Sequence, residues 1–374
     1  MKFDINAREL SNCLSLLYKA IPNKTSLPLF ECFLFNVKGN VMEVTASDTE
    51  TRLNARVDVF NTVGEGLFAV GAKLLIKPLS ELKGQLLTFN VNDVTKEVTV
   101  HYSNGEFSVV GMNETTYPEM NGGNDGEEYA MAINALVLKH TIERTINQVS
   151  DDTLRPVMCG ILFDVKESAI SFCATNGNKL VAIHEQMNTE KFTPFSFILS
   201  KRSAMLLNGF LGNENEIKIS VKGNKSSFIG DNFAMECRLI EGRYPNYESV
   251  IPKSYANKAT FNKAELVNAI RRVSAFANPE TALIAIDFAD EKSTVKAKDV
   301  DFATSANEKI DCVYLGADLS IGLKSTYLMD LLSVVETEDV IIESNNDKQA
   351  IMIRPDDSEI KGRVRMILMP MMLD

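Results

Sequence analysis

The sequence has no tryptophan and only three histidines among its 374 residues. His101, His140 and His184 stand apart, and none has a ligand-like neighbour at metal spacing, so we expect neither a metal ion nor a cofactor. The six cysteines form no C-x-x-C pair and fall inside apolar runs. This usage predicts buried free thiols in a reducing compartment.

Long apolar segments are also missing. No run approaches the ~18 apolar residues that cross a membrane. The N-terminus, MKFDINAREL, has no apolar signal core. We therefore expect a cytoplasmic protein.

Local catalytic motifs are absent as well: there is no GxSxG, no GxxxxGK[ST] and no HExxH. Asp151 with Asp152, and Asp356 with Asp357, sit in polar, loop-like stretches, which favours solvated surface over an acid–base pair. A catalytic triad stays open, because its members meet only in space. The sequence favours a protein that is not an enzyme.

The chain does contain an internal repeat. Asn6, Asn134 and Asn262 are 128 residues apart, and each opens a segment with the same apolar spacing. Leucine stands four residues after each asparagine, and leucine or isoleucine eight residues after it: Leu10, Leu138, Leu266, Leu14, Ile142 and Ile270. PLFECFLFNV also returns after 128 residues as PVMCGILFDV, and a third copy, TALIAIDFAD, is shifted by three residues. These anchors predict three domains, at 1–122, 128–252 and 253–374.

Each repeat is predicted to carry two helices and several short, alternating strands. The first helices are expected near 6–20, 134–149 and 262–276, and the second near 72–83, 200–211 and 324–337. This pattern predicts an α+β fold in which two helices pack on antiparallel sheet in every repeat. Pro78 should kink or shorten its helix.

Two joints are expected between the repeats. Residues 114–128, rich in Gly, Asn and acid, favour a flexible joint. Residues 241–258 contain Pro245, Pro252, Tyr244 and Tyr247, which favour a stiff, packed connector.

Positive charge is concentrated in the six helical windows. They hold 13 Lys or Arg against 6 Asp or Glu, a net of +7 in a chain of net charge −11, so the remainder carries −18. Arg8 and Lys19 lie on the helix face opposite the leucines. We expect these faces to contact DNA, although ordinary solvated helix faces also carry Lys and Arg. The predicted contacts are Arg8, Lys19, Lys73, Lys77, Lys139, Arg144, Lys201, Arg202, Lys263, Arg271 and Arg272.

The last ten residues, RMILMPMMLD, hold four methionines around Pro370. Arg363 to Met369 is predicted to be a final edge strand. A methionine-rich segment also suits an adaptable binding groove. The residues alone leave groove and plain core open.

Several motifs together resemble the bacterial DNA polymerase III β subunit family, the sliding clamps. They are the triple repeat, the MKF start, TSLPLF (25–30), ATNGNKL (174–180), EGRYPNYESVIP (241–252) and MPMML (369–373). The resemblance implies a head-to-tail homodimeric ring that encircles duplex DNA without sequence specificity and tethers the replicative polymerase. It also implies a nucleoid-associated protein that binds short peptides of the DNA polymerase III catalytic subunit, the clamp loader, other polymerases, mismatch-repair proteins and ligase.

The resemblance further assigns residues. Lys24 matches a basic DNA-contacting loop position, and Phe107 and Val109 of the first domain should meet Ala275 and Phe276 of the third at the dimer seam. The partner-peptide pocket maps to Arg155, Met158, Thr175, Gly177, Asn178, Lys179, Leu180, Pro245, Val250, Tyr327, Met369, Pro370, Met371, Met372 and Leu373.

The chain departs from the family pattern at TNGNKL, where the family usually has TDGHRL, and at Ser249 and Met372, where basic residues are common. Lysine in place of arginine should weaken bidentate contacts. The alternative from another class is a triplicated cytosolic scaffold that binds peptides and never encloses DNA.

Overall fold

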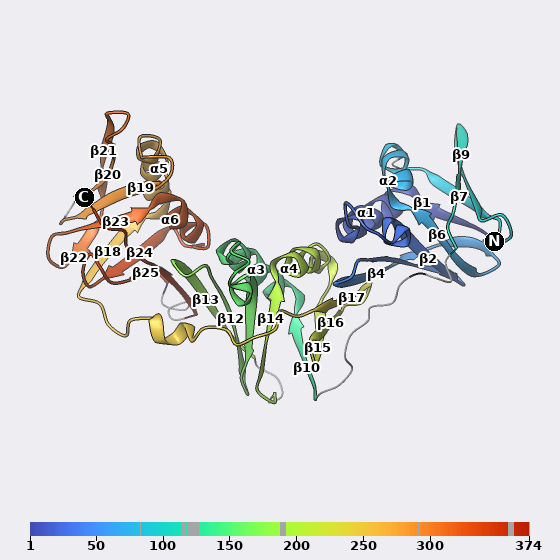
Figure 1. The fold of residues 1–374 in the computed structure, drawn as a ribbon, viewed down its shortest axis with the longest axis horizontal. Helices are drawn as coiled ribbons and strands as arrows, with labels where there is room; N and C mark the ends of the chain where they lie inside the picture. The colour runs from blue at the N-terminus through green and yellow to red at the C-terminus, as the bar shows by residue number, and fades with distance from the viewer. Residues whose placement is uncertain are drawn as a thin grey trace. The chain divides into compact units, whose positions relative to one another are not determined.

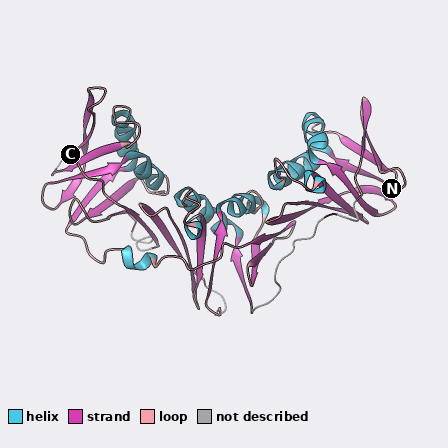
Figure 2. Ribbon diagram, viewed as in Figure 1, coloured by secondary structure: helices cyan, strands magenta, loops and turns pink. Residues whose placement is uncertain are grey.

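The computed structural model describes residues 1–82, 84–113, 117, 127–187, 192–290, 292–357 and 363–373. The chain divides into two compact units, one formed by Met1–Lys139 with Arg202–Leu239 and the other by His140–Lys201 with Ile240–Asp374. Every strand pairing recorded within them is antiparallel, as expected, and helices lie against the strands in each unit (Figures 1 and 2). Among the described residues, no helix is long and apolar enough to span a membrane.

The first unit contains a five-stranded and an eight-stranded sheet. The five-stranded order is β5 (Phe60–Val63), β1 (Lys2–Asn6), β7 (Leu86–Val91), β8 (Glu97–Tyr102) and β9 (Gly105–Val110). The eight-stranded order is β10 (Glu128–Asn134), β15 (Glu216–Lys222), β16 (Lys225–Ile229), β17 (Phe233–Arg238), β4 (Thr51–Asp58), β3 (Val41–Ser47), β2 (Cys32–Lys38) and β6 (Gly66–Gly71). Helices α1 (Ala7–Leu17) and α2 (Ala72–Glu81) contact each other, and Leu10, Leu14 and Leu17 of α1 are fully buried.

The second unit contains a nine-stranded and a four-stranded sheet. The nine-stranded order is β14 (Phe195–Ser200), β11 (Gly160–Val165), β12 (Ala169–Thr175), β13 (Lys179–Gln186), β26 (Val364–Leu368), β25 (Ile351–Pro355), β24 (Asp339–Ser344), β18 (Asn257–Asn262) and β22 (Val313–Leu315). The four-stranded order is β21 (Thr304–Asp311), β20 (Lys292–Asp299), β19 (Leu283–Phe288) and β23 (Leu319–Lys324). Helices α5 (Lys263–Ser274) and α6 (Ser325–Leu332) cover the core of this unit (Figure 1).

The central repeat supplies elements to both units. Helix α3 (Ala135–Thr145) begins in the first unit and ends in the second, and α4 (Lys201–Asn208) runs from the second into the first. Short 3-10 helices occupy the connections: η1 (Tyr18–Ala20), η2 (Pro28–Glu31), η4 (Ile146–Gln148), η5 (Pro156–Met158), η6 (Leu211–Asn213) and η7 (Tyr247–Val250).

The three asparagines at the 128-residue period are the residues at which a strand ends and a helix begins. The Asn6 side chain accepts a hydrogen bond from the Arg8 amide at 2.9 Å. Asn134 accepts one from Leu136 at 3.0 Å, and Asn262 accepts one from Ala264 at 3.1 Å. Such a cap satisfies an amide that has no partner inside the helix, and replacing it with alanine costs about 1 kcal/mol. The repeat therefore preserves a helix start, which explains why asparagine recurs.

A second recurring feature was not predicted. In each repeat, the fourth residue of the strand before the second helix accepts a backbone hydrogen bond from the segment that leaves the repeat. Ala69 accepts from Met112 at 2.9 Å, Ile198 from Ile240 at 3.0 Å and Gly322 from Met371 at 2.8 Å. The sequence does not display this bond, because the accepting residue differs from repeat to repeat.

One expectation about elements was tested in part and another was wrong. Pro78 does not make α2 shorter than the other second helices, since α2 spans ten residues while α4 and α6 span eight each, and a kink at Pro78 stays a prediction. The methionine-rich end is also not an edge strand, because β26 pairs with β13 on one side and β25 on the other.

Of the two predicted joints, the structure describes one and leaves most of the other outside the described residues. The connector at 241–258 is packed as expected, because Tyr244 and Tyr247 are buried against the nine-stranded sheet. The predicted flexible joint at 114–128 lies almost entirely outside the described residues.

Candidate functional sites

The first candidate site is the set of lysines and arginines on and beside the helices. The Arg8 and Lys19 side chains are exposed, opposite the buried leucines of α1. Seven of the predicted contacts have no side-chain hydrogen bond or ion pair within the described part of the chain: Arg8, Lys19, Lys24, Lys73, Lys77, Lys139 and Arg271. These cations are available to an anionic ligand without first breaking an internal interaction.

The remaining five predicted contacts are held within the protein. The ion pairs are Arg144 with Glu336, Lys201 with Asp151 at 2.8 Å, Arg202 with Asp48 at 2.7 Å and Arg272 with Glu308 at 2.9 Å from Nε. Lys263 donates to the carbonyl of Val335 at 2.5 Å. Except for Arg272 and Glu308, whose separation is 36 residues, these partners are at least 50 residues apart, so the spacing gave no signal.

Two of the carboxylates in these pairs, Glu308 and Asp151, are stabilised in their charged form. The hydrogen bond from Arg272 lowers the pKa of Glu308, and the hydrogen bond from Lys201 lowers the pKa of Asp151. Both acids stay ionised at neutral pH and partly neutralise their cations. Of the twelve predicted cations, the seven that have no internal partner therefore contribute more to the positive surface than the five that do.

The second candidate site is the turn between β12 and β13. The Thr175 hydroxyl donates to the Lys179 carbonyl at 2.7 Å and accepts from the Gly177 amide at 3.0 Å. The Asn176 side chain accepts from the amides of Asn178 and Lys179, both at 3.0 Å. Gly177 has a φ of +92°, a region that favours glycine. Local hydrogen bonds thus fix this turn.

Arg155 lies beside the same turn. Its Nη1 atom is 3.2 Å from the position that a Cβ would take on Gly177. Its Nε donates to Asp152 at 2.9 Å. Met158, at the end of η5, is half-buried, and its carbonyl accepts from Ser150 at 2.8 Å. The structure therefore brings the predicted Arg155 to the turn.

Lys179 does not project from the turn into solvent. Its side chain is 4 % exposed, and Nζ donates to the Asn147 carbonyl at 2.7 Å and to the Asp330 carboxylate of α6. Nζ also lies 5.2 Å from the centre of the Tyr327 ring, and Lys324 lies 4.9 Å from it. A cation so placed joins the central repeat to the third and leaves no free ammonium for a ligand.

Apolar side chains lie on the connector side of the sheet. Leu180 of β13 is directly paired with Ile367 of β26, and both pack with Tyr244, Tyr247 and Met352. Burial raises the pKa of Tyr247 to about 12, so its hydroxyl stays neutral. Pro245 is half-buried and Val250 exposed along the connector. The sequence reasoning missed Ile367 and Met352, although Ile367 lies within the methionine-rich segment RMILMPMMLD.

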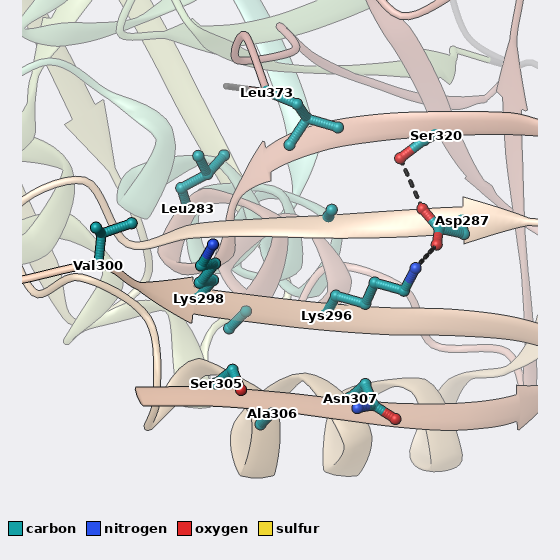
Figure 3. A pocket seen from close by; sticks show the side chains of 12 residues that line it. Leu283, Asp287, Lys296, Lys298, Val300, Ser305, Ala306, Asn307, Ser320 and Leu373 are labelled. Carbon is teal, nitrogen blue, oxygen red and sulfur yellow. Dashed lines mark hydrogen bonds and ion pairs between the residues drawn. The ribbon is translucent and has the colours of Figure 1, made fainter. Parts of the chain in front are cut away.

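The methionine-rich residues are divided between two places. The Met369 amide donates to the Asn178 carbonyl at 2.8 Å, which puts Met369 beside the turn. Pro370 and Met371 are half-buried, and Met372 is 86 % exposed. Leu373 instead lines a hollow on the four-stranded sheet, where Figure 3 shows it beside Leu283. The predicted pocket residues are therefore not all brought together.

The predicted seam residues lie in different units. Phe107 and Val109 are half-buried on β9, an edge strand of the five-stranded sheet. Ala275 and Phe276 are exposed directly after α5. The Thr304 hydroxyl donates to the Phe276 carbonyl at 3.4 Å, so Phe276 lies beside edge strand β21.

Three repeats of helix pairs on antiparallel sheet, with free cations on the helices, define the class of DNA clamps. Models of the N-terminal, central and C-terminal domains of the DNA polymerase III beta subunit match residues 1–121, 132–246 and 248–372. The chain belongs to the DNA polymerase III beta subunit family.

Individual relatives agree with this membership. The beta sliding clamp of Buchnera aphidicola subsp. Rhopalosiphum padi is 23% identical over 98% of this chain and 100% of its own length. That of Staphylococcus aureus is 24% identical over 96% of this chain and 97% of its own. The fold resembles a Pseudomonas aeruginosa sliding clamp solved bound to griselimycin, with a TM-score of 0.93 and 21% identity over all of both chains. It also resembles the Thermotoga maritima beta subunit, with a TM-score of 0.89, 21% identity and the same coverage. A sliding clamp is a non-catalytic accessory factor of DNA replication.

Proposed function

We propose that two copies of this chain form a head-to-tail ring that encircles duplex DNA and tethers the replicative DNA polymerase. One observation carries the proposal: a chain of net charge −11 exposes unpaired cations along helices that recur in its three repeats. Cations that face phosphates give attraction that ignores sequence and falls with salt. Since a closed ring stays on DNA by topology, weak contacts suffice and permit sliding. The acidic remainder discourages binding elsewhere on the surface.

The proposed DNA contacts are foremost the seven free cations. Lys24 lies in the loop after η1, and Arg271 is in the last turn of α5. Arg144, Lys201, Arg202, Lys263 and Arg272 are secondary contacts, because each must leave or share an internal partner. The ring is closed at the proposed seam of Phe107 and Val109 with Ala275 and Phe276, where apolar burial drives association.

The proposed partner site extends from the 175–180 turn along the connector. Leu180 supplies an apolar floor, Pro245 and Val250 line one side, and Met369 supplies an adaptable side chain. It would take short, apolar-anchored peptides of the polymerase catalytic subunit, the clamp loader, other polymerases, mismatch-repair proteins and ligase. Since the P. aeruginosa clamp was solved with griselimycin, a fluorescent derivative of that ligand is a suitable probe here. We also propose a cytoplasmic, nucleoid-associated location.

The ring proposal is tested by loading the protein on nicked circular DNA and cutting half of the sample to linear form. We expect retention on the circle and rapid loss from the linear DNA, because only the circle has no ends. Equal release from both would contradict enclosure. Equal release together with intact probe binding would favour the peptide-binding scaffold.

A matched pair of substitutions tests the charge proposal. Arg271→Gln removes a free cation, whereas the adjacent Arg272→Gln removes one held by Glu308. We expect Arg271→Gln to lower the salt dependence of DNA binding by about one unit and Arg272→Gln to lower it less. An equal or larger effect of Arg272→Gln would contradict the division into free and engaged cations.

A further inference from the structure

Residues 369–373, which leave the third repeat, are fixed at two points. The Met369 amide donates to Asn178 of the 175–180 turn, and the Met371 amide donates to Gly322 of β23, both at 2.8 Å. The first point belongs to the proposed partner site and the second to the four-stranded sheet. The course of the segment between them therefore depends on both.

Gly322 allows the segment to cross β23. A Cβ on Gly322 would lie 2.4 Å from the Met371 carbonyl oxygen and 2.9 Å from Leu373 Cδ2. The three atoms nearest to that Cβ all belong to residues 369–373, and the φ of Gly322 is not in the left-handed region. Glycine is thus required here by close approach and not by backbone conformation. In the first repeat the glycine is on the other partner: Ala69 lies on the strand and Gly111 on the departing segment. A Cβ on Gly111 would lie 2.6 Å from the Ala69 carbonyl oxygen.

Beyond the crossing, Leu373 reaches a hollow of about 500 Å³ on the four-stranded sheet. Its apolar lining residues are Leu283, Ala285, Val300 and Ala306, and Lys298 lies beside Leu283 (Figure 3).

The other end of the hollow is polar and internally paired. Ser320 donates to Asp287 at 2.6 Å, and Lys296 forms an ion pair with the same carboxylate. Burial opposes ionisation of Asp287, but the hydrogen bonds from Lys296 and Ser320 prevail and lower its pKa. Asp287, Lys296 and Ser320 therefore satisfy one another, and Leu373, which is 41 % exposed, lies beside the apolar lining residues.

We propose that residues 369–373 act as a clasp in which Leu373 is the anchor, the hollow is its socket and Gly322 is the crossing point. Seating of Leu373 holds Met371 on β23 and thereby Met369 at the partner site, so Leu373 is a positioning residue and not a wall of the partner pocket. This inference rests on the proposed partner site. An apolar ligand that fills the socket would release the clasp and weaken partner binding at a distance.

Hydrogen exchange of the Met371 amide, followed by mass spectrometry of the full chain, reports seating directly. We expect exchange to be at least tenfold faster in Gly322→Ala and in Leu373→Ser, and near the original rate in Leu373→Met, which keeps an apolar side chain. Gly66→Ala is the matched control, because it lies on β6, the corresponding strand of the first repeat, where a Cβ would meet only Met1 Cε at 4.0 Å. An unchanged exchange rate of the Met371 amide in both Gly322→Ala and Leu373→Ser overturns the clasp. Unchanged exchange of the β19 and β20 amides shows that the four-stranded sheet is intact in these variants.

Titration with the fluorescent griselimycin probe separates the clasp from the partner site. We expect five- to tenfold weaker binding in Leu373→Ser and recovery in Leu373→Met. Faster Met371 exchange with unchanged probe affinity would overturn the coupling and leave the partner site standing. If the unaltered chain bound no probe, the proposed partner site would fail, whereas the exchange result would still decide whether the clasp exists.

Discussion

The chain joins its repeats at two places by the same backbone device and surrounds the two joints with different side chains. At the first joint, β4 pairs with β17 over five residue pairs, from Phe233 with Ala55 to Cys237 with Thr51. At the second, β13 pairs with β26 over five residue pairs, from Lys179 with Leu368 to Ile183 with Val364. Each joint makes one continuous antiparallel sheet out of strands from two repeats.

Ion pairs with solvent-accessible arginines flank the first joint. Asp48 is buried and accepts from the amides of Glu50 and Thr51, while its partner Arg202 has a side chain that is 50 % exposed. Arg238 and Glu50 are 3.5 Å apart and both are accessible. Such pairs contribute little, because water competes for both charges.

The second joint is enclosed on both faces. Lys179 is buried beside α6, and the connector covers the opposite face with Tyr244 and Tyr247. Only this joint combines an ordered turn, a packed connector and a methionine-rich segment within the described residues. The comparison teaches that backbone pairing links the repeats at both joints, whereas the surrounding side chains decide which joint is enclosed.

Removing the connector's aromatic packing should have the largest effect. Tyr244→Ala is expected to lower the free energy of unfolding by about 3 kcal/mol, since it leaves a cavity against Leu162, Cys173 and Leu180. Denaturant unfolding measures the change. Tyr244→Phe keeps the ring and loses the hydroxyl, which donates a 3.4 Å hydrogen bond to the Cys173 carbonyl, so its cost should be about 1 kcal/mol. Equal costs for the two variants would show that the connector does not close this joint.

Neutralising the acid at each joint should give the next largest difference. Asp330→Asn leaves the buried Lys179 ammonium without a carboxylate, and we expect a loss of about 2 kcal/mol, less than for a fully buried pair because Asp330 is partly exposed. Asp48→Asn leaves an arginine that water can reach, and we expect about 1 kcal/mol or less. Thermal unfolding of both variants makes the comparison. A larger loss for Asp48→Asn would reverse the ranking of the joints.

Binding of the griselimycin probe should distinguish the joints by about 1 kcal/mol. Val250→Ala removes exposed apolar surface from η7 beside the second joint and should weaken binding about fivefold. Arg238→Ala at the first joint should leave the dissociation constant unchanged. Fluorescence anisotropy measures both. A comparable loss in Arg238→Ala would mean that the probe does not choose the second joint.

The smallest effect is expected for Glu50→Gln. Its exposed pair with Arg238 should contribute about 0.5 kcal/mol or less, which is near the limit of denaturant unfolding. A loss above about 1 kcal/mol would show that the first joint depends on its surface charges after all.

Much of the fold followed from local sequence signals. Helix starts were marked by Asn6, Asn134 and Asn262, and the buried side of α1 by Leu10 and Leu14, because caps and apolar stripes are properties of a few consecutive residues. The packed connector was predicted for the same reason. Whether β26 lies at the edge or in the centre of its sheet could not be predicted, since its position depends on pairing with β13 from another repeat.

The candidate sites were predicted only in part. Arg155, Leu180 and Met369 lie at the 175–180 turn as expected, whereas Lys179 is directed inward to Asp330 and Leu373 reaches a separate hollow. Nothing in the letters TNGNKL distinguishes an inward lysine from an outward one. Its direction depends on Asp330, 151 residues away.

The sequence by itself determined that three like units exist, where their helices begin and which helix faces carry positive charge, because each of these depends on neighbouring residues. Tertiary structure alone decided which cations remain free, which joint is enclosed and where residues 369–373 lie. Those outcomes depend on partners far apart in the chain, and a charge or an apolar side chain has no fixed role until its spatial neighbours are set.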